Sequence, residues 1–240
     1  AGGTTQGGGT ATSAAIRIVE PVVTVAKAVT PNTPPTAGDV LTYAVDLAAT
    51  SGANLSSAFD LGLVDSLSLG LEYVAGSARV GGVAIEPDVS GDGTTTAQTL
   101  TWSGIDIPEG TTVAVTYDVR VLDSVGAGQI LSNSATARWT SLDGAPVHPG
   151  ATVTEERNGT GTPAHNDYFA TATSTPLTVA DNTTLAKARL TDTWIAADAN
   201  LRVGDRVDYE LRLGLQEGTH SNVVLTDTLP AGMVFENVVS

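Results

Sequence analysis

The sequence predicts an all-β protein built from many short strands joined by tight turns, and three observations support this fold class. Apolar and polar side chains alternate in segment after segment, which is the pattern of half-buried strands. No segment combines a helical period with helix-capping residues. The composition agrees, because the 240 residues include 26 glycines, only 5% are aromatic and 41% are hydrophobic. A chain of this length can form one or two cores.

Charge and residue types exclude several classes of function. The formal net charge is −15, so we expect neither nucleic acid nor an anionic membrane as a partner. The chain has no cysteine, which excludes disulfides and thiolate metal sites. No apolar run is long enough for a transmembrane helix, so we expect no membrane insertion. The chain starts with AGGTTQ and shows no signal peptide, so we expect a mature or internal piece of a longer protein.

The first strand of the main unit is predicted at residues 21–30, after a Gly/Thr-rich stretch (1–12) and a short strand at 15–20. Lys27 lies on the apolar face of this strand, among valines. That face comprises Val23, Val25, Lys27 and Val29. The chain has nine arginines and only two lysines. Because a buried lysine can lose its proton and an arginine cannot, we interpret Lys27 as a reactive amine.

Two further polar side chains lie on apolar faces of predicted strands. Asp65 shares its face with Phe59, Leu61, Leu63 and Leu67, and Asn133 shares its face with Leu131, Ala135, Ala137 and Trp139. Strands are also predicted at 40–47, 100–107 with a kink at Gly104, 111–122 and 169–179, and a strand and a turn are predicted at 71–80. The alternation therefore singles out Lys27, Asp65 and Asn133 as polar groups in the expected core.

Two long loops are the remaining candidates for binding. Residues 86–98 form an acidic, glycine-rich loop, and residues 141–167 are expected to form a long hairpin or an Ω-like excursion. Asp88 and Asp92 are weak calcium candidates, because acidic glycine turns usually bind nothing. We otherwise expect no cofactor. Trp102 and Trp139 are expected to be core residues.

The sequence repeats itself after residue 180. LAKAR at 185–189 matches VAKAV at 25–29, and VGDRVDYELRL at 203–213 matches AGDVLTYAVDL at 37–47. Lys187 and Asp227 are the counterparts of Lys27 and Asp65. We therefore divide the chain into three parts. These are the end of a preceding repeat or a linker (1–20), a complete repeat (21–179) and the first part of the next repeat (180–240).

These motifs resemble a family of tandem repeats of unknown function from large bacterial surface proteins. The resemblance is carried by AKAV, GDVLTYAVDL, LVDSLSLGLEYVAGS, LTWSGIDIPEGTTVAVTYDVRV and SNSATARW, in that order, and covers nearly all of residues 21–240. The second copy has LTDTLPAGMVF, which is closer to the family pattern than DSLSLG in the first. This family is similar to the isopeptide-forming domains of fimbrial and adhesin proteins.

The resemblance implies immunoglobulin-like β-sandwich repeats in tandem, on a secreted or cell-surface fibre. It also implies a bond between Lys27 and Asn133, formed with the help of Asp65, at the three positions that the alternation had selected. Two other interpretations remain open for Lys27: an amine that reaches solvent at the strand edge, and a buried Lys27–Asp65 ion pair without a bond. Lys187 is expected to form no bond within residues 1–240, because its asparagine partner would lie further along.

We therefore expect a structural stalk or filament module of an adhesin-like fibre at the cell surface, cross-linked by its own chemistry. Its partners would be neighbouring repeats and other copies in a filament. The alternative is an extracellular module that recognises a glycan or a protein through its loops, with Tyr168 and Phe169 as the nearest exposed aromatic candidates. An enzyme with turnover is not expected, because the sequence shows neither an acid pair nor a nucleophile motif.

Overall fold

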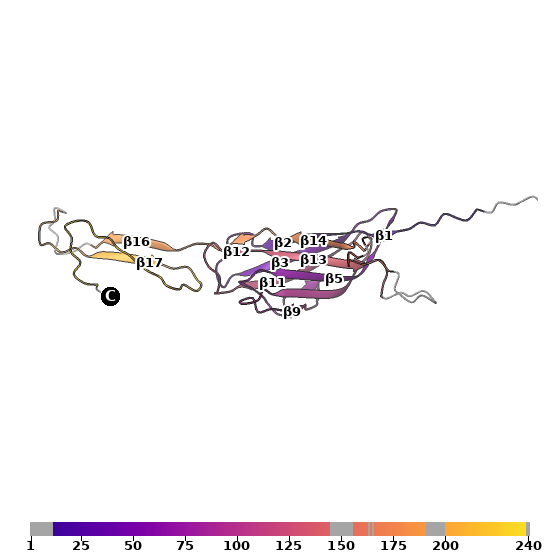
Figure 1. The fold of residues 1–240 in the computed structure, drawn as a ribbon, viewed down its shortest axis with the longest axis horizontal. Helices are drawn as coiled ribbons and strands as arrows, with labels where there is room; N and C mark the ends of the chain where they lie inside the picture. Colours follow the sequence, from indigo (N-terminus) through magenta and orange to yellow (C-terminus); the bar gives the residue numbers. More distant parts are fainter. Residues whose placement is uncertain (1–11, 145–155, 163, 165, 191–199, 239–240) are drawn as a thin grey trace, which may run out of the picture.

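The structure is a computed structural model that describes residues 12–144, 156–162, 164, 166–190 and 200–238. Every regular element in this part of the chain is a β-strand, which confirms the predicted all-β class (Figure 1). The strands are β1 (Glu20–Pro21), β2 (Val23–Thr30), β3 (Val40–Ala49), β4 (Leu55–Ser56), β5 (Ala58–Leu67), β6 (Leu71–Tyr73), β7 (Arg79–Val80), β8 (Val83–Ala84), β9 (Asp88–Ser90), β10 (Thr99–Ile107), β11 (Thr112–Val121), β12 (Ile130–Leu131), β13 (Asn133–Thr140), β14 (Phe169–Thr173), β15 (Leu177–Thr178), β16 (Thr184–Arg189) and β17 (Tyr209–Gly214).

Two antiparallel sheets form the body of the protein. One has the strand order β14-β13-β5-β10-β9, and the other has the order β2-β3-β11-β7-β8, with β6 also paired to β11. Alternate side chains of each strand point between the sheets, so the inner faces together form one core. The result is the β-sandwich that the sequence predicted, with consecutive parts of the chain distributed over both layers.

The core is aliphatic, with a few large aromatic rings. On β3 the buried residues are separated by more exposed ones, as the alternation of Leu41, Tyr43, Val45 and Leu47 predicted. Trp102 and Trp139 are buried, which confirms their predicted place in the core. The largest fully buried side chains are Tyr43, Tyr117, Leu41, Leu47, Leu61, Leu63, Leu71, Leu100, Ile107, Leu131, Val45 and Val115.

The predicted kink at Gly104 is confirmed. The pairing of β10 with β5 shifts between Trp102 and Ile105, and Gly104 has φ +69°. A side chain is strained at such a φ, so a glycine allows the bulge. At the second shift of the same pairing, between Ile105 and Ile107, Asp60 on β5 also has a positive φ, of 48°, which was not predicted from the sequence.

Several predicted boundaries were wrong. The strand expected at 15–20 is absent except for Glu20, which pairs in parallel with Leu55, and Ile16 and Ile18 are exposed. The acidic loop 86–98 contains a short strand, β9, paired with β10. The segments 130–139 and 169–179 are each divided into two strands, which belong to different sheets. The expected excursion at 141–167 lies partly outside the described residues.

The segment that matches residues 25–47 in sequence forms a similar antiparallel hairpin, β16–β17. In β2–β3, Lys27 lies opposite Val45, and in β16–β17, Lys187 lies opposite Leu211. This hairpin extends from one end of the sandwich, whereas the described N-terminal residues leave from the other (Figure 1). The Thr219 amide donates to the Asp123 carbonyl at 2.8 Å, so a loop of the second repeat contacts the end of the first.

We expect Leu63→Ala to lower the free energy of unfolding by about 2–5 kcal/mol, because Leu63 is completely buried and its truncation leaves a cavity. The matched control is Val64→Ala on the same strand, whose side chain points to the outer face and is 39% exposed. We expect the control to change stability by less than about 0.5 kcal/mol. Urea denaturation of both variants tests this, and equal effects would contradict the assigned faces of β5.

Candidate functional site

Lys27 lies inside the sandwich, as the alternation on β2 predicted. Its side chain has no exposed surface, and it lies on the face that also contains Val25 and Val29. Lys27 as a whole residue is partly exposed, and this exposed surface belongs to its main chain, as expected for an edge strand. The interpretation of a lysine that reaches solvent at the strand edge is thus wrong.

Asp65 and Asn133 reach the same region from the opposite sheet. Asp65 on β5 pairs with Ala135 on β13, and Asn133 pairs with Leu67. Because side chains two positions apart on a strand share a face, Asp65 and Asn133 are diagonal cross-strand neighbours on the inner face. Asp65 is 0% exposed and Asn133 is 1% exposed. The structure thus brings together the three residues that the sequence analysis selected.

Tyr117 joins these residues through its hydroxyl group. The Lys27 amine forms an ion pair with Asp65 Oδ2 and also donates to the Tyr117 hydroxyl at 3.0 Å. Asn133 Nδ2 donates to the same hydroxyl at 2.8 Å. Two hydrogen bonds therefore connect Lys27 Nζ with Asn133 Nδ2 through the Tyr117 hydroxyl. Alternation predicts Tyr117 as a core residue but does not reveal this contact, because its signal in the sequence is a hydroxyl on the inward face of 111–122.

Two tyrosine rings flank the lysine. Lys27 Nζ lies 5.0 Å from the centre of the Tyr43 ring and 5.3 Å from that of Tyr117. These rings exclude water from the amine and offer it the negative face of a π system. The site is therefore dry, and each interaction in it is stronger than it would be in water.

Burial shifts the pKa values of both ionisable partners towards their neutral forms. Desolvation lowers the pKa of Lys27, although the charge of Asp65 acts in the opposite direction. Desolvation also raises the pKa of Asp65, opposed by Lys27 and by hydrogen bonds. Both shifts favour transfer of the proton from the amine to the carboxyl group. The arrangement can therefore provide a neutral amine, which a nucleophile requires.

Two oxygens of the site have no hydrogen-bond partner. They are Asp65 Oδ1 and Asn133 Oδ1, and both are fully buried. An unpaired buried acceptor costs about 1–3 kcal/mol, so native proteins rarely contain one without a reason. A proton on Asp65 would provide a donor for the amide oxygen of Asn133. Such a hydrogen bond would polarise the amide carbonyl for attack.

Lys187, Asp227 and Tyr209 form a similar group of side chains near the C-terminal end of the described residues. Lys187 Nζ lies 2.6 Å from Asp227 Oδ1 and 4.5 Å from the centre of the Tyr209 ring, and Tyr209 is the counterpart of Tyr43. The two side chains are 34% and 30% exposed. The described residues of this repeat include no counterparts of β11 and β13, which cover the first site. The counterparts of Lys27 and Asp65 thus also form an ion pair, but in a solvated setting.

Among the described residues, the calcium candidates Asp88 and Asp92 belong to no cluster of three or more possible metal ligands. Asp92 instead caps a turn, because its Oδ1 accepts from the backbone amides of Thr94, Thr95 and Thr96. The hydrogen bond from the Thr95 hydroxyl to Asp92 Oδ2, followed by these amide hydrogen bonds, lowers the pKa of Asp92. Asp88 lies exposed on β9.

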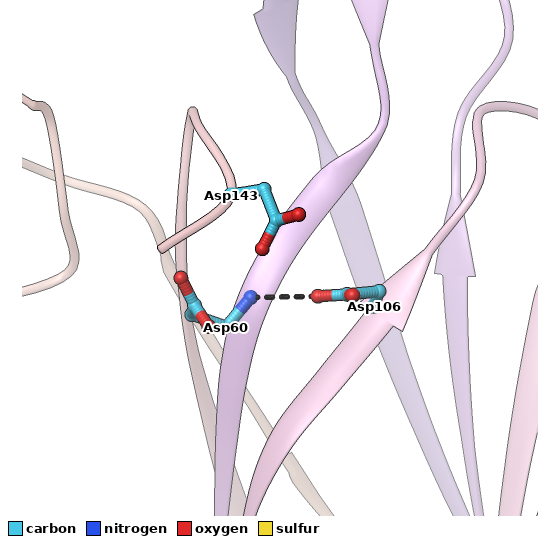
Figure 2. A group of neighbouring side chains, drawn as sticks. All are labelled: Asp60, Asp106 and Asp143. Atoms are coloured by element: carbon cyan, nitrogen blue, oxygen red, sulfur yellow. Dashed lines mark hydrogen bonds between the residues drawn. The ribbon is translucent and has the colours of Figure 1, made fainter. Parts of the chain in front are cut away.

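A different group of carboxylates lies at the bulge on β5. Figure 2 shows Asp60, Asp106 and Asp143, which each offer an oxygen within 4.8 Å of the others. All three are exposed, and backbone amides already bind two of them. The Asp60 amide donates to Asp106 Oδ1 at 3.0 Å, and the Gly144 amide donates to Asp60 Oδ2 at 2.8 Å. The sequence analysis missed this group because its members are far apart in the chain.

The aromatic residues considered for loop binding differ in exposure. Tyr168 is buried, with its ring stacked on Trp139 at 6.1 Å, so it is unavailable to a ligand. Phe169 is 48% exposed, with the Arg138 guanidinium 5.3 Å from its ring centre. In the described residues, no helix could cross a membrane.

Comparison with known proteins gives structural neighbours from the class that the motifs indicated. The major pilin subunit BcpA of Bacillus cereus matches at 13% identity and a TM-score of 0.38, over 69% of this chain and 42% of the pilin. The full-length major pilin SpaD of Corynebacterium diphtheriae matches at 16% identity and a TM-score of 0.39, over 70% of this chain and 36% of the pilin.

An enzyme is also similar: AvmM, which catalyses macrocyclisation in alchivemycin A biosynthesis, matches at 9% identity and a TM-score of 0.41, over 67% of this chain and 89% of AvmM. No family model and no curated protein matches the chain. This chain spans less than half the length of the two pilins. At TM-scores below 0.5 these similarities carry no argument about function, which has to come from the site.

We expect Lys27→Met to make stability depend on pH. Without the lysine, the Asp65 carboxylate has no counter-charge, and burial raises its pKa in the folded state. When the pKa of a carboxyl group is higher in the folded state than in the unfolded state, its contribution to stability is complete below the unfolded pKa of about 3.8. This contribution is lost as the pH rises through the folded pKa. Urea denaturation from pH 4 to 8 should show a decline of up to about 1.4 kcal/mol per pH unit.

The double variant Lys27→Met/Asp65→Leu is the control, because it removes both charges from the core. Its stability should not fall over this pH range. If the single variant were equally insensitive to pH, Asp65 would not be desolvated as the structure shows.

Proposed function

We propose that the complete repeat is a structural module of an extracellular, cell-surface fibre, and that it joins its own two sheets by an isopeptide bond between Lys27 and Asn133. The observation that carries this proposal is the convergence of a fully buried amine, carboxyl group and amide at one point of the core. Neighbouring repeats and other copies in a filament are the partners that such a module implies.

The bond would form in one irreversible reaction. The Lys27 proton passes to Asp65, and the neutral Nζ attacks the Asn133 carbonyl carbon. The protonated Asp65 donates to the amide oxygen and stabilises the charge that develops there. The bond between that carbon and Nδ2 then breaks, ammonia leaves, and Nζ remains attached as an amide. Positioning and desolvation by the core provide the catalysis, so the protein reacts once and does not turn over.

The position of the bond supports a mechanical role. Lys27 lies on β2 at the start of the unit and Asn133 on β13 of the other sheet. A link between them closes a loop of roughly 100 residues, which corresponds to about 4–5 kcal/mol in the chain-entropy description of cross-links. A pulling force on the chain would then be carried by a covalent bond between the sheets, in a protein that has no disulfides.

A buried ion pair without a bond is the competing interpretation of the same contacts. Taking two charges out of water costs several kcal/mol, which their attraction only partly offsets. The two unpaired oxygens at the site would remain unexplained by an ion pair. The isopeptide proposal gives both of them a role.

Intact-mass spectrometry tests the proposal. We expect the purified chain to be lighter than its sequence by one ammonia. The variants Lys27→Ala, Asn133→Ala and Asp65→Ala should have their full sequence masses, because each removes a reacting or assisting group. Digestion of the wild-type protein should release a branched peptide that contains both Lys27 and Asn133.

Lys187→Ala is the matched control, because it removes the other lysine of the chain. It should retain the mass deficit of one ammonia. A wild-type mass equal to that calculated from the sequence would rule out the bond. If Lys187→Ala lost the mass deficit, the reacting lysine would be Lys187 and not Lys27.

A further inference from the structure

We propose that the Tyr117 hydroxyl carries the proton from the attacking nitrogen to the leaving nitrogen, and so acts as a catalytic residue of the cross-linking reaction. This inference rests on the proposed function. It starts from one observation: a single hydroxyl contacts both nitrogens, Lys27 Nζ at 3.0 Å and Asn133 Nδ2 at 2.8 Å.

The reaction requires such a transfer. When Nζ attacks, it still carries one proton more than the product amide nitrogen will hold. Nδ2 needs one proton more before it can leave as ammonia. In solution water would carry this proton, but the Lys27 and Asp65 side chains have no exposed surface and Asn133 is 1% exposed. Asp65 already contacts Lys27 through Oδ2, and its proton is required at the Asn133 oxygen.

Tyr117 can make the transfer without changing its own charge. Its hydroxyl oxygen accepts the proton from Nζ while its own proton passes to Nδ2, so atoms and charges balance and the phenol is restored. Burial raises the pKa of Tyr117 well above its ordinary value, with the charge of Asp65 as the next contribution. Tyrosinate is thereby disfavoured, and the hydroxyl remains both a donor and an acceptor throughout the reaction.

The surrounding rings hold Tyr117 in position. Its ring stacks on Tyr43 at 5.8 Å, and it also contacts Trp102 at 5.6 Å and Tyr73 at 6.3 Å. Tyr117 lies directly opposite Tyr43 in the β11–β3 register. Phenylalanine would fill the same space, so Tyr117→Phe removes the hydroxyl and keeps these ring contacts.

Tyr73→Phe is the matched control. The Tyr73 ring also contacts Tyr117, but its hydroxyl donates to Glu86 at 2.6 Å, away from the reacting groups. Both substitutions remove one hydroxyl from the same aromatic cluster. They differ in whether that hydroxyl contacts the two nitrogens.

The experiment follows freshly synthesised full-length protein by intact mass over time. We expect Tyr117→Phe to lose ammonia at least about 100-fold more slowly than the wild type, the size of effect typical of proton transfer by a positioned side chain. Tyr73→Phe should react at close to the wild-type rate. Thermal unfolding of both substitutions in a Lys27→Ala background, where no bond forms, separates any loss of stability from the loss of rate.

A second measurement uses the wild-type protein alone and does not depend on the variant folding. If two protons move together through Tyr117, a plot of reaction rate against the fraction of deuterium in the solvent should be curved and not linear. A linear dependence, or a Tyr117→Phe rate within a few-fold of the wild type, would overturn the relay while leaving the cross-link intact. A wild-type protein that loses no ammonia would overturn the proposed function itself.

Discussion

The contact between Lys27 and Asp65 is the constraint on which the centre of this sandwich depends. The two side chains come from opposite sheets, and neither has any exposed surface. Because an unpaired charge at this depth would be very costly, each charged side chain is stabilised in the core by the other. Tyr43 and Tyr117 flank the amine, and the Asn133 amide is connected to it through the Tyr117 hydroxyl. The pairing of the two charges also fixes how the sheets face each other, since a one-residue slip of β2 or β5 would turn its charge outwards.

Much of this arrangement could be predicted from alternation alone. A strand has a period of two, so the parity of a residue determines whether it faces the core. Lys27, Asp65 and Asn133 were each identified because they interrupt an apolar row, and the structure confirms all three as buried residues of one cluster. Their proximity in space did not follow from parity. It depends on the order of the strands in the two sheets, which alternation does not reveal; the proximity of the three residues was implied only by the family resemblance.

The features that the sequence did not reveal depend on contacts between distant segments. Tyr117 has the same parity as four valines on its strand, and nothing in the pattern distinguishes a tyrosine that fills space from one whose hydroxyl contacts two nitrogens. The carboxylates of Asp60, Asp106 and Asp143 meet only because β5 and β10 bulge beside the turn that follows β13. The segment 15–20 shows the converse error. Its apolar alternation is typical of a strand, but most of it has no neighbouring strand in this structure.

The partly exposed pair in the second repeat suggests how the timing of the proposed reaction is controlled. Lys187 and Asp227 already lie in contact while about a third of each side chain remains solvated. Water still reaches both side chains, so the desolvation that the proposed reaction requires is incomplete at this pair. At Lys27 and Asp65, by contrast, neither side chain has any exposed surface. Because Lys27 on β2 is synthesised well before Asn133 on β13, the proposed reaction would wait until the two sheets had packed and desolvated the pair. The proposed bond would then form only in completely folded molecules, and it would be irreversible.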